Sequence, residues 1–242
     1  MTTLIIGLGN IGMEVGVRLH ERIDADGVDL DVGRREQWLR RTGQEALASL
    51  DEVAWTDVER ALIIVRSSAT AFALAKEIGH RARGTLACHL MTTLDHDDAA
   101  SISSLEDHGI VRYLEQPVSG GAAGARAGGL TIFTAGPITA LDEEFLHSHL
   151  ATRLFPFAAY GQPTMAKLIN NTAAAYHLGV AAWALGVAED HGIAPSTMHD
   201  VLQSSSGASA ISALARHMGP DQGELLVKDV GLLAAVAGPH RR

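Results

Sequence analysis

Three glycines near the start of the chain limit most strongly what it can fold into. Gly7, Gly9 and Gly12 form a G-x-G-x-x-G pattern that follows the apolar segment Leu4–Ile6 directly and opens a helical pattern. The first glycine permits a tight turn, the second lets the backbone approach a pyrophosphate, and the third allows the helix to pack closely on the strand. The amino end of that helix attracts phosphate charge. The pattern therefore predicts a strand–turn–helix unit that binds a dinucleotide.

Short apolar runs alternate with helical patterns over residues 1–160, which is typical of βαβ units around a parallel sheet. The expected strands are Thr3–Ile6, Val28–Val32, Ala61–Val65, Leu86–Leu90, Val111–Leu114 and Leu130–Ala135. The expected helices are Ile11–Arg22, Arg35–Leu50, Ala71–Arg81, Asp97–His108, Thr164–Asp190 and Pro195–Gly207. The predicted fold class is therefore α/β, with a Rossmann-type doubly wound parallel sheet over residues 1–160 and a smaller all-α domain over residues 161–242.

The end of the second strand discriminates between NAD and NADP. An acidic side chain at that place accepts hydrogen bonds from the ribose hydroxyls of NAD, whereas an arginine accommodates the 2′-phosphate of NADP. This chain has Gly33-Arg34-Arg35 there, and a guanidinium donates paired, charge-assisted hydrogen bonds to a phosphate. The sequence therefore predicts NADP. NAD stays the alternative if the strand ends early, because Asp31, which shares a strand face with Asp29, would then meet the ribose.

The charge balance favours a small-molecule partner. The chain has 28 Asp and Glu against 19 Lys and Arg, so it lacks the basic surplus that nucleic acid or an anionic membrane attracts. Its single cysteine, Cys88, excludes an intramolecular disulfide, and no signal-peptide pattern opens the sequence. The apolar stretch Ala173–Ala188 is shorter than the roughly 20 residues of a membrane span and predicts a core or interface helix. We expect a cytoplasmic protein.

Two further segments carry side chains suited to chemistry. The run from Gln116 to Gly121 follows a strand and offers several backbone N–H groups beside the Ser119 hydroxyl, so it either binds a carboxylate or forms an ordinary turn. Lys167 and Asn171 lie four residues apart on one helix face and can act on one atom. A lysine in a closed cleft loses hydration and becomes a general acid or base, while a solvated helix face is the alternative interpretation.

Other patterns argue against competing classes of site. His147 and His149 lie in an acidic helical segment without a third ligand at a recognisable spacing, and His96 precedes two acids that favour a helix start. We therefore expect no metal. The serines from Ser204 to Ser206 lack a nucleophile-elbow pattern, and no Walker-type motif is present in the sequence. Hydrolase and nucleoside-triphosphatase hypotheses are excluded on that basis.

Four motifs, taken in their order, resemble the β-hydroxyacid dehydrogenases. This family includes 3-hydroxyisobutyrate dehydrogenase, tartronate semialdehyde reductase and, more distantly, 6-phosphogluconate dehydrogenase. The motifs are Gly7-Leu8-Gly9-Asn10-Ile11-Gly12, Pro117-Val118-Ser119-Gly120-Gly121, Lys167-Leu168-Ile169-Asn170-Asn171 and Lys228-Asp229. Together they span nearly the whole chain, and four motifs in order are far more specific than any one of them.

The resemblance implies a function and a set of roles. It implies a nicotinamide-dependent oxidoreductase that acts on the CH–OH or carbonyl group of a small β-hydroxyacid or aldehyde-acid, in a dimer or tetramer with the substrate between the two domains. Together with the arginine pair, it leads us to expect NADP as the cofactor and a homodimer. Lys167 would be the acid or base at the reacting oxygen, and Asn171 would orient it. The substrate carboxylate would bind Ser119, Gly120 and Gly121. The residues implied to contact the dinucleotide are Gly7, Leu8, Gly9, Asn10, Ile11, Gly12, Arg34, Arg35, Val65, Arg66, Thr92 and Lys228.

Several residues depart from the family pattern. Glu115-Gln116 replaces the usual Asp-Ala before the carboxylate loop, and we expect this change to alter the substrate side of that loop. Arg66 replaces a common proline and adds a cation near the cofactor, while Pro163 replaces a glycine. The helical domain is shorter than usual, so we expect either a partner subunit to cover the site or a more open site.

Two alternative functions stay open. An imine reductase shares the overall architecture, although Lys167 and the Ser119 loop argue against that chemistry. A non-catalytic NADP-binding regulatory protein would keep the fold without a competent site, and the residue Gln116 and the short helical domain favour this hypothesis.

Overall fold

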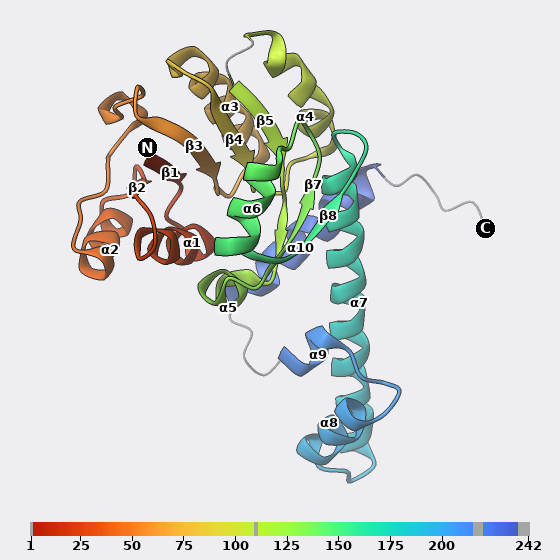
Figure 1. Cartoon of the computed structure of the whole chain (residues 1–242). Helices are drawn as coiled ribbons and strands as arrows, with labels where there is room; N and C mark the ends of the chain where they lie inside the picture. The colour runs from red at the N-terminus through yellow and green to blue at the C-terminus, as the bar shows by residue number, and fades with distance from the viewer. Residues whose placement is uncertain (1, 109–110, 215–219, 237–242) are drawn as a thin grey trace. The chain divides into compact units, whose positions relative to one another are not determined.

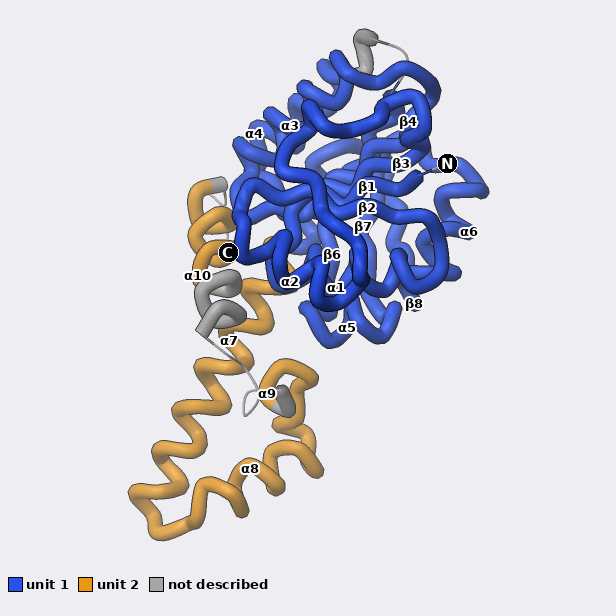
Figure 2. The backbone as a smooth tube through the Cα atoms, turned by 90° about the vertical axis from the view of Figure 1, so that its left-hand side faces the viewer, with its two compact units in different colours: residues 1–167 blue, residues 168–242 orange. Residues whose placement is uncertain are grey.

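The computed structural model describes residues 2–108, 111–214 and 220–236. The described chain divides into two compact units, which Figure 2 distinguishes by colour. Unit 1 comprises residues 1–167 and holds both sheets, whereas unit 2 comprises residues 168–242 and is helical.

A parallel sheet forms the centre of unit 1. Among the described residues it has five strands in the order β2-β1-β3-β4-β5, every pair of which is parallel. The strands are β1 (Thr2–Ile6), β2 (Ala25–Val28), β3 (Val58–Ile63), β4 (Leu86–Leu90) and β5 (Val111–Glu115). Because the chain reverses direction across the sheet after β2, the carboxyl ends of β1 and β3 flank the crevice where such folds bind ligands. The predicted α/β fold class is confirmed.

Helices cover both faces of this sheet (Figure 1). Ile5 and Leu62 pack with residues of α1 and α2, whereas Leu4 and Ile63 pack with α3 on the other face. Successive strand residues point to opposite faces, so each strand contributes to both hydrophobic clusters. The helices of this part are α1 (Asn10–His20), α2 (Val32–Thr42), α3 (Ser68–Arg81) and α4 (His96–Ala100), with the 3₁₀ segments Leu50–Glu52 and Ser101–His108.

The second strand ends earlier than the sequence predicts. Instead of Val28–Val32, the observed β2 is Ala25–Val28, and Val28 pairs with Ile6. Asp29 ends the strand because its Oδ1 accepts a hydrogen bond from the backbone N–H of Asp31 at 2.8 Å, which turns the chain. Asp31 then caps α2 by accepting the N–H of Arg34 at 2.8 Å.

Two further predicted elements are also shifted. Helix α2 stops at Thr42 rather than continuing to Leu50, because Gly43 adopts a left-handed conformation (φ 77°) at its carboxyl end. Strand β3 (Val58–Ile63) begins three residues before the predicted start, Ala61, and ends two residues before the predicted end, Val65. Val65 therefore lies in the turn after the strand. The predicted types of these elements are correct, whereas their bounds are wrong.

A smaller sheet follows the parallel one within unit 1. Its strands are β6 (Val118–Ser119), β7 (Leu130–Thr134) and β8 (Ala151–Pro156), with β6 antiparallel and β8 parallel to β7. Helices α5 (Gly121–Ala127) and α6 (Ala140–His149) connect these strands. A backbone bridge between Glu115 and Ala135 joins the two sheets just before the predicted carboxylate loop.

Unit 2 consists of helices. Helix α7 (Gln162–Asp190) begins in unit 1 and continues into unit 2, where α8 (Pro195–Ser204), α9 (Ala210–Leu214) and α10 (Pro220–Val236) follow. For Ala173–Ala188, the core alternative is only partly found, because Tyr176, Val180 and Trp183 are exposed in the single chain, and the interface alternative stays a prediction. None of the described helices is both long and apolar enough to cross a membrane.

Candidate functional site

The glycine turn lies at the carboxyl end of β1. Gly7 has φ 97°, and a Cβ atom there would lie 2.4 Å from the carbonyl oxygen of Ile64, so both the conformation and the space require glycine. A Cβ at Gly12 would lie 1.9 Å from the Gly7 carbonyl oxygen. At Gly9 nothing lies within 4 Å of the corresponding position. Protein atoms therefore leave no room for a side chain at Gly7 and Gly12, whereas the space beside Gly9, which the sequence assigns to the pyrophosphate, is open.

Asp29 is the acidic residue next to this turn. It directly follows β2, and its Oδ2 accepts a hydrogen bond from the backbone N–H of Leu8 at 2.7 Å. Sequence reasoning did not include Asp29 among the site residues because it placed the strand end at Val32, four residues after the observed end at Val28. The available signal was its distance from Gly7, since the ribose-binding acid lies roughly 20 residues beyond the glycine pattern.

The two predicted phosphate-binding arginines lie in the first turn of α2. The Nη1 atom of Arg35 donates to the carbonyl oxygens of Asp29 and Leu30, each at 2.8 Å, so this guanidinium stabilises the turn after β2. The Arg34 side chain is partly exposed beside that turn. Both arginines are partly exposed, and Arg35 is the one whose guanidinium holds the local backbone.

The predicted residues after β3 and β4 meet at the same edge of the sheet. The backbone N–H of Val65 donates to Thr92 Oγ1 at 2.9 Å, and the Thr92 hydroxyl donates to the Val65 carbonyl oxygen at 3.0 Å. Thr92 is buried, whereas Arg66 is exposed. Because Ile64 borders Gly7, the turns after β1, β3 and β4 gather at the crevice that the strand order predicts.

The predicted carboxylate loop crosses from β6 into α5. Ser119 ends β6, and both Gly120 (φ 124°) and Gly121 (φ 60°) have backbone conformations that favour glycine. Ser119 and Gly121 are half-buried and Gly120 is exposed. The loop thus presents a hydroxyl and backbone at the surface of unit 1, while Val118 behind it is buried.

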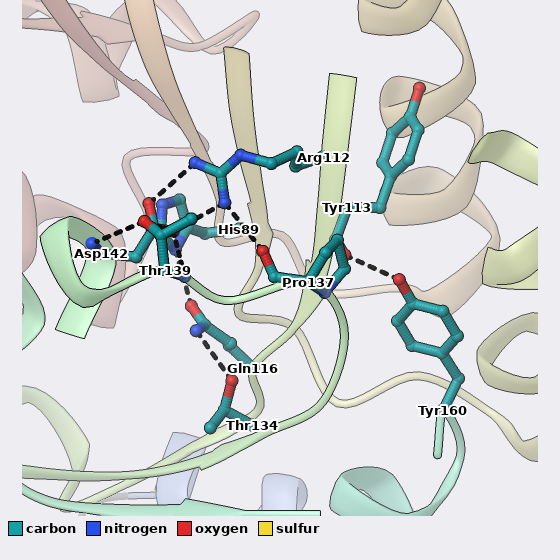
Figure 3. Close-up of polar contacts among 9 residues, drawn as sticks. All are labelled: His89, Arg112, Tyr113, Gln116, Thr134, Pro137, Thr139, Asp142 and Tyr160. Atoms are coloured by element: carbon teal, nitrogen blue, oxygen red, sulfur yellow. Dashed lines mark hydrogen bonds and ion pairs between the residues drawn. The ribbon is translucent and has the colours of Figure 1, made fainter. Parts of the chain in front are cut away.

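Gln116 points into the protein beneath this loop (Figure 3). Its Oε1 lies 2.6 Å from His89 Nδ1, which donates because the amide oxygen has no proton, and its Nε2 donates to Thr134 Oγ1 at 3.0 Å. Burial lowers the pKa of His89 to about 4, so the imidazole is neutral at neutral pH. The Gln116 side chain therefore joins β4 to β7, and its expected effect on the substrate side of the loop stays a prediction.

Glu115 is also fully buried, and it contacts the start of α7. Its Oε2 accepts the backbone N–H of Gly161 at 2.6 Å, and its Oε1 accepts the backbone N–H of Thr164 at 2.8 Å. Burial raises the pKa of the Glu115 carboxyl, while the hydrogen bonds from Thr164 and Gly161 act in the opposite direction. This side chain is therefore buried against the start of α7 and is not exposed on the loop.

Lys167 lies one turn further along α7 and is only 7% exposed. In unit 2, the Nδ2 atom of Asn171 donates to Asp229 Oδ2 at 2.6 Å, and Asp229 is buried. Lys228 precedes it on α10 and is half-buried. Asp229 belongs to the Lys-Asp motif, but sequence reasoning assigned it no role. The structure shows that it holds the side chain of Asn171.

The described residues contain no cluster of three or more His, Cys, Asp or Glu that could hold a metal ion.

Comparison with known proteins identifies the family. A family model described as the NAD binding domain of 6-phosphogluconate dehydrogenase matches residues 3–145. The chain belongs to this family, whose matched region covers the glycine turn, the crevice edge and the carboxylate loop. The resemblance predicted from the four motifs is confirmed at this level.

Its relatives include hydroxyacid dehydrogenases. An L-threonate dehydrogenase of Cupriavidus necator is 36% identical over 108 residues, which cover 43% of this chain and 36% of the relative. An L-threonate dehydrogenase of Haemophilus influenzae is 27% identical over 85% of this chain and 70% of its own length. The solved structure of 3-hydroxyisobutyrate dehydrogenase from Salmonella typhimurium matches with a TM-score of 0.83 and 25% identity, over 98% of this chain and 87% of that one. The predicted enzyme class, an NAD(P)-dependent dehydrogenase, is confirmed.

Proposed function

We propose that this protein oxidises the alcohol of a small β-hydroxyacid, or reduces the matching aldehyde-acid, with NADP as cofactor. One observation carries the proposal. Lys167 is nearly fully buried near the start of α7, and the amino end of that helix is hydrogen-bonded to Glu115, four residues before Ser119. A candidate acid or base and a candidate carboxylate loop are therefore linked within unit 1.

Each predicted residue has a distinct task in this mechanism. The Ser119 hydroxyl and the backbone of Gly120 and Gly121 bind the substrate carboxylate and orient the chain that carries the alcohol. A bound nicotinamide supplies the hydride acceptor or donor. During oxidation the neutral amine of Lys167 takes the hydroxyl proton, and during reduction its ammonium returns one to the carbonyl oxygen. Asn171 orients the reacting oxygen, and Asp229 holds the Asn171 amide in place.

The direct test of this mechanism is Lys167→Ala. A panel of L-threonate, 3-hydroxyisobutyrate, glyoxylate, succinic semialdehyde and tartronate semialdehyde is assayed first with the unaltered protein, by the absorbance of the reduced cofactor. With the best substrate, we expect the substitution to lower kcat by at least about 100-fold, because general acid–base catalysis contributes 10²–10⁴-fold. The Kd of the cofactor, measured by fluorescence titration, should stay nearly unchanged. Equal turnover by the variant would refute the role of Lys167, and tight cofactor binding without turnover of any substrate would favour a regulatory protein.

The choice of NADP rests on Arg34. This residue is partly exposed in the first turn of α2, where a guanidinium can meet a 2′-phosphate, whereas Arg35 already bonds two carbonyl oxygens. The double substitution Arg34→Ala with Arg35→Ala should weaken NADPH binding about tenfold or more, since charge-assisted bonds are the strong ones, and should change NADH binding far less. Arg34→Ala alone should account for most of the loss.

NAD is the second candidate because of Asp29. The carboxylate directly follows β2, and each of its oxygens accepts one backbone N–H, which leaves further lone pairs for ribose hydroxyls. A 2′-phosphate beside the same carboxylate would meet like charge. If Asp29→Asn weakens NADH binding and the arginine substitutions leave the preference unchanged, NAD is the cofactor and the NADP assignment is wrong.

We also propose that residues 161–242 form the substrate and dimerisation domain and that α7 pairs with a second copy of this chain. Six of its exposed residues are apolar and recur at alternating spacings of four and three, which is the pattern of a helix-pairing seam. These residues are Ile169, Ala173, Tyr176, Val180, Trp183 and Val187. A cavity of about 430 Å³ lies beside this seam, between Trp183 of α7 and Val230 of α10. Light scattering at several concentrations should show a dimer that Trp183→Glu converts to a monomer, and a monomeric unaltered protein would contradict the proposal.

A further inference from the structure

The residues Glu115 and Gln116 are neighbours in the chain but are bonded to different parts of unit 1. Both are fully buried directly before the loop that begins at Pro117. Gln116 bonds His89 of β4 and Thr134 of β7, and its backbone N–H donates to the Leu90 carbonyl oxygen at 2.8 Å. These contacts anchor the loop to both sheets.

Glu115 makes the other connection, to the helix that carries Lys167. Its two carboxylate oxygens each accept one backbone N–H at the start of α7, from Gly161 and Thr164. The first N–H groups of any helix have no partner within the helix, so a carboxylate that accepts two of them fixes both the position and the direction of the helix end. Lys167 lies three residues beyond Thr164, within the next helical turn.

We infer that Glu115 is a positioning residue that sets Lys167 against the carboxylate loop. The inference rests on the proposed function, because it assigns to Glu115 the spacing between two groups of that site. The connection is short. Ser119 is four positions after Glu115 in the chain, and the two hydrogen bonds of Glu115 reach the helical turn that precedes Lys167. A displacement at either hydrogen bond therefore moves Lys167 relative to a substrate held by its carboxylate, and a misplacement of about 1 Å can cost 10²-fold in rate.

The chemistry of the side chain matters as well as its length. A glutamate has acceptor atoms only, so both of its oxygens can face N–H donors, whereas a glutamine would turn an NH₂ group toward one of them. Glu115→Gln has nearly the same volume, so it tests the two-acceptor contact without opening a cavity. Glu115→Asp keeps both acceptors and the charge but is shorter by one methylene, so it tests the length.

The experiment compares kcat and KM across three variants of Glu115 and Gln116, with Asp142→Asn as the control and Lys167→Ala as the test of the function. We expect Glu115→Gln to lower kcat at least about tenfold because Lys167 is displaced, with KM and the cofactor Kd changed less than about twofold. Glu115→Asp should recover part of this loss. Gln116→Ala leaves the helix contact in place and loosens the loop, so it should raise KM for the carboxylate substrate more than it lowers kcat.

The matched control is Asp142→Asn. Asp142 is a buried carboxylate that caps α6 and bonds Arg112, and α6 carries none of the proposed site residues (Figure 3). Its substitution should lower the melting temperature at least as much as Glu115→Gln does and leave kcat unchanged. This control separates a general loss of stability from a displaced Lys167.

The outcomes distinguish the inference from the function it depends on. If Lys167→Ala abolishes turnover while Glu115→Gln lowers only the melting temperature, as Asp142→Asn does, Glu115 is structural and the inference is wrong. If Lys167→Ala leaves turnover intact, the proposed function fails first. A kcat loss in Glu115→Gln that Glu115→Asp partly restores supports the positioning role.

Discussion

Two buried glutamates of unit 1 are held in opposite ways. Glu14 of α1 accepts hydrogen bonds from Arg41 of α2 and Arg126 of α5, at 2.8 to 3.0 Å, and these bonds lower its pKa to about 2. Glu115 accepts the backbone N–H groups of Gly161 and Thr164, and burial raises its pKa. The first carboxylate is paired with cations that join three helices, whereas burial opposes the ionisation of the second, which holds one helix end. The comparison indicates that Glu14 serves stability and Glu115 serves position.

The largest effect expected from this comparison is on the acid unfolding of Glu14→Gln. The folded-state pKa of Glu14 lies below its ordinary value of 4.5, so its ionisation stabilises the fold above about pH 4.5 and this stability is lost as the pH falls toward about 2. At about 1.4 kcal/mol per pKa unit, the loss amounts to about 3 kcal/mol. Urea unfolding between pH 7 and pH 2 should show this loss in the unaltered protein and a shallower decline in the variant. Parallel curves would show that Glu14 does not contribute as proposed.

A smaller effect should separate the two arginines that bind Glu14. Arg41 is 29% exposed and Arg126 is 68% exposed, so solvent screens the second contact far more than the first. We expect Arg41→Ala to lower the free energy of unfolding by about 2 kcal/mol, because it leaves a buried carboxylate with one partner fewer. Arg126→Ala should cost less. If urea unfolding shows the same loss of unfolding free energy for both variants, the exposure of the arginine does not determine how much each contact stabilises the fold.

The smallest expected effect concerns the pH dependence of Glu115→Gln. A carboxyl whose folded-state pKa is raised contributes stability at low pH that is lost as the pH rises through the folded pKa, which is the opposite sign to Glu14. The variant lacks this loss, so its stability relative to the unaltered protein should improve as the pH rises above the ordinary glutamate value of 4.5. A variant that becomes relatively less stable over that range would contradict the raised pKa.

The comparison also shows where sequence reasoning ends. The glycine turn was predicted correctly because Gly7 and Gly12 face backbone atoms that any such turn brings close. The end of β2 was predicted wrongly because Asp29 binds its neighbour Asp31, a local choice that alternation of apolar residues does not reveal. The contacts of Glu115 and Gln116 could not be predicted because their partners lie 18 to 49 residues away in the sequence.

The sequence alone determined the class of this protein, since a glycine pattern after a strand and four motifs in order specify backbone shapes and reactive groups that depend on local spacing. Only the tertiary structure decided which acids lie beside the proposed site. Asp29 lies beside the glycine turn because β2 pairs with β1, and Glu115 contacts the start of α7 although Gly161 lies 46 residues further along the chain. Contacts of this kind arise from long-range packing, whose partners no local pattern encodes.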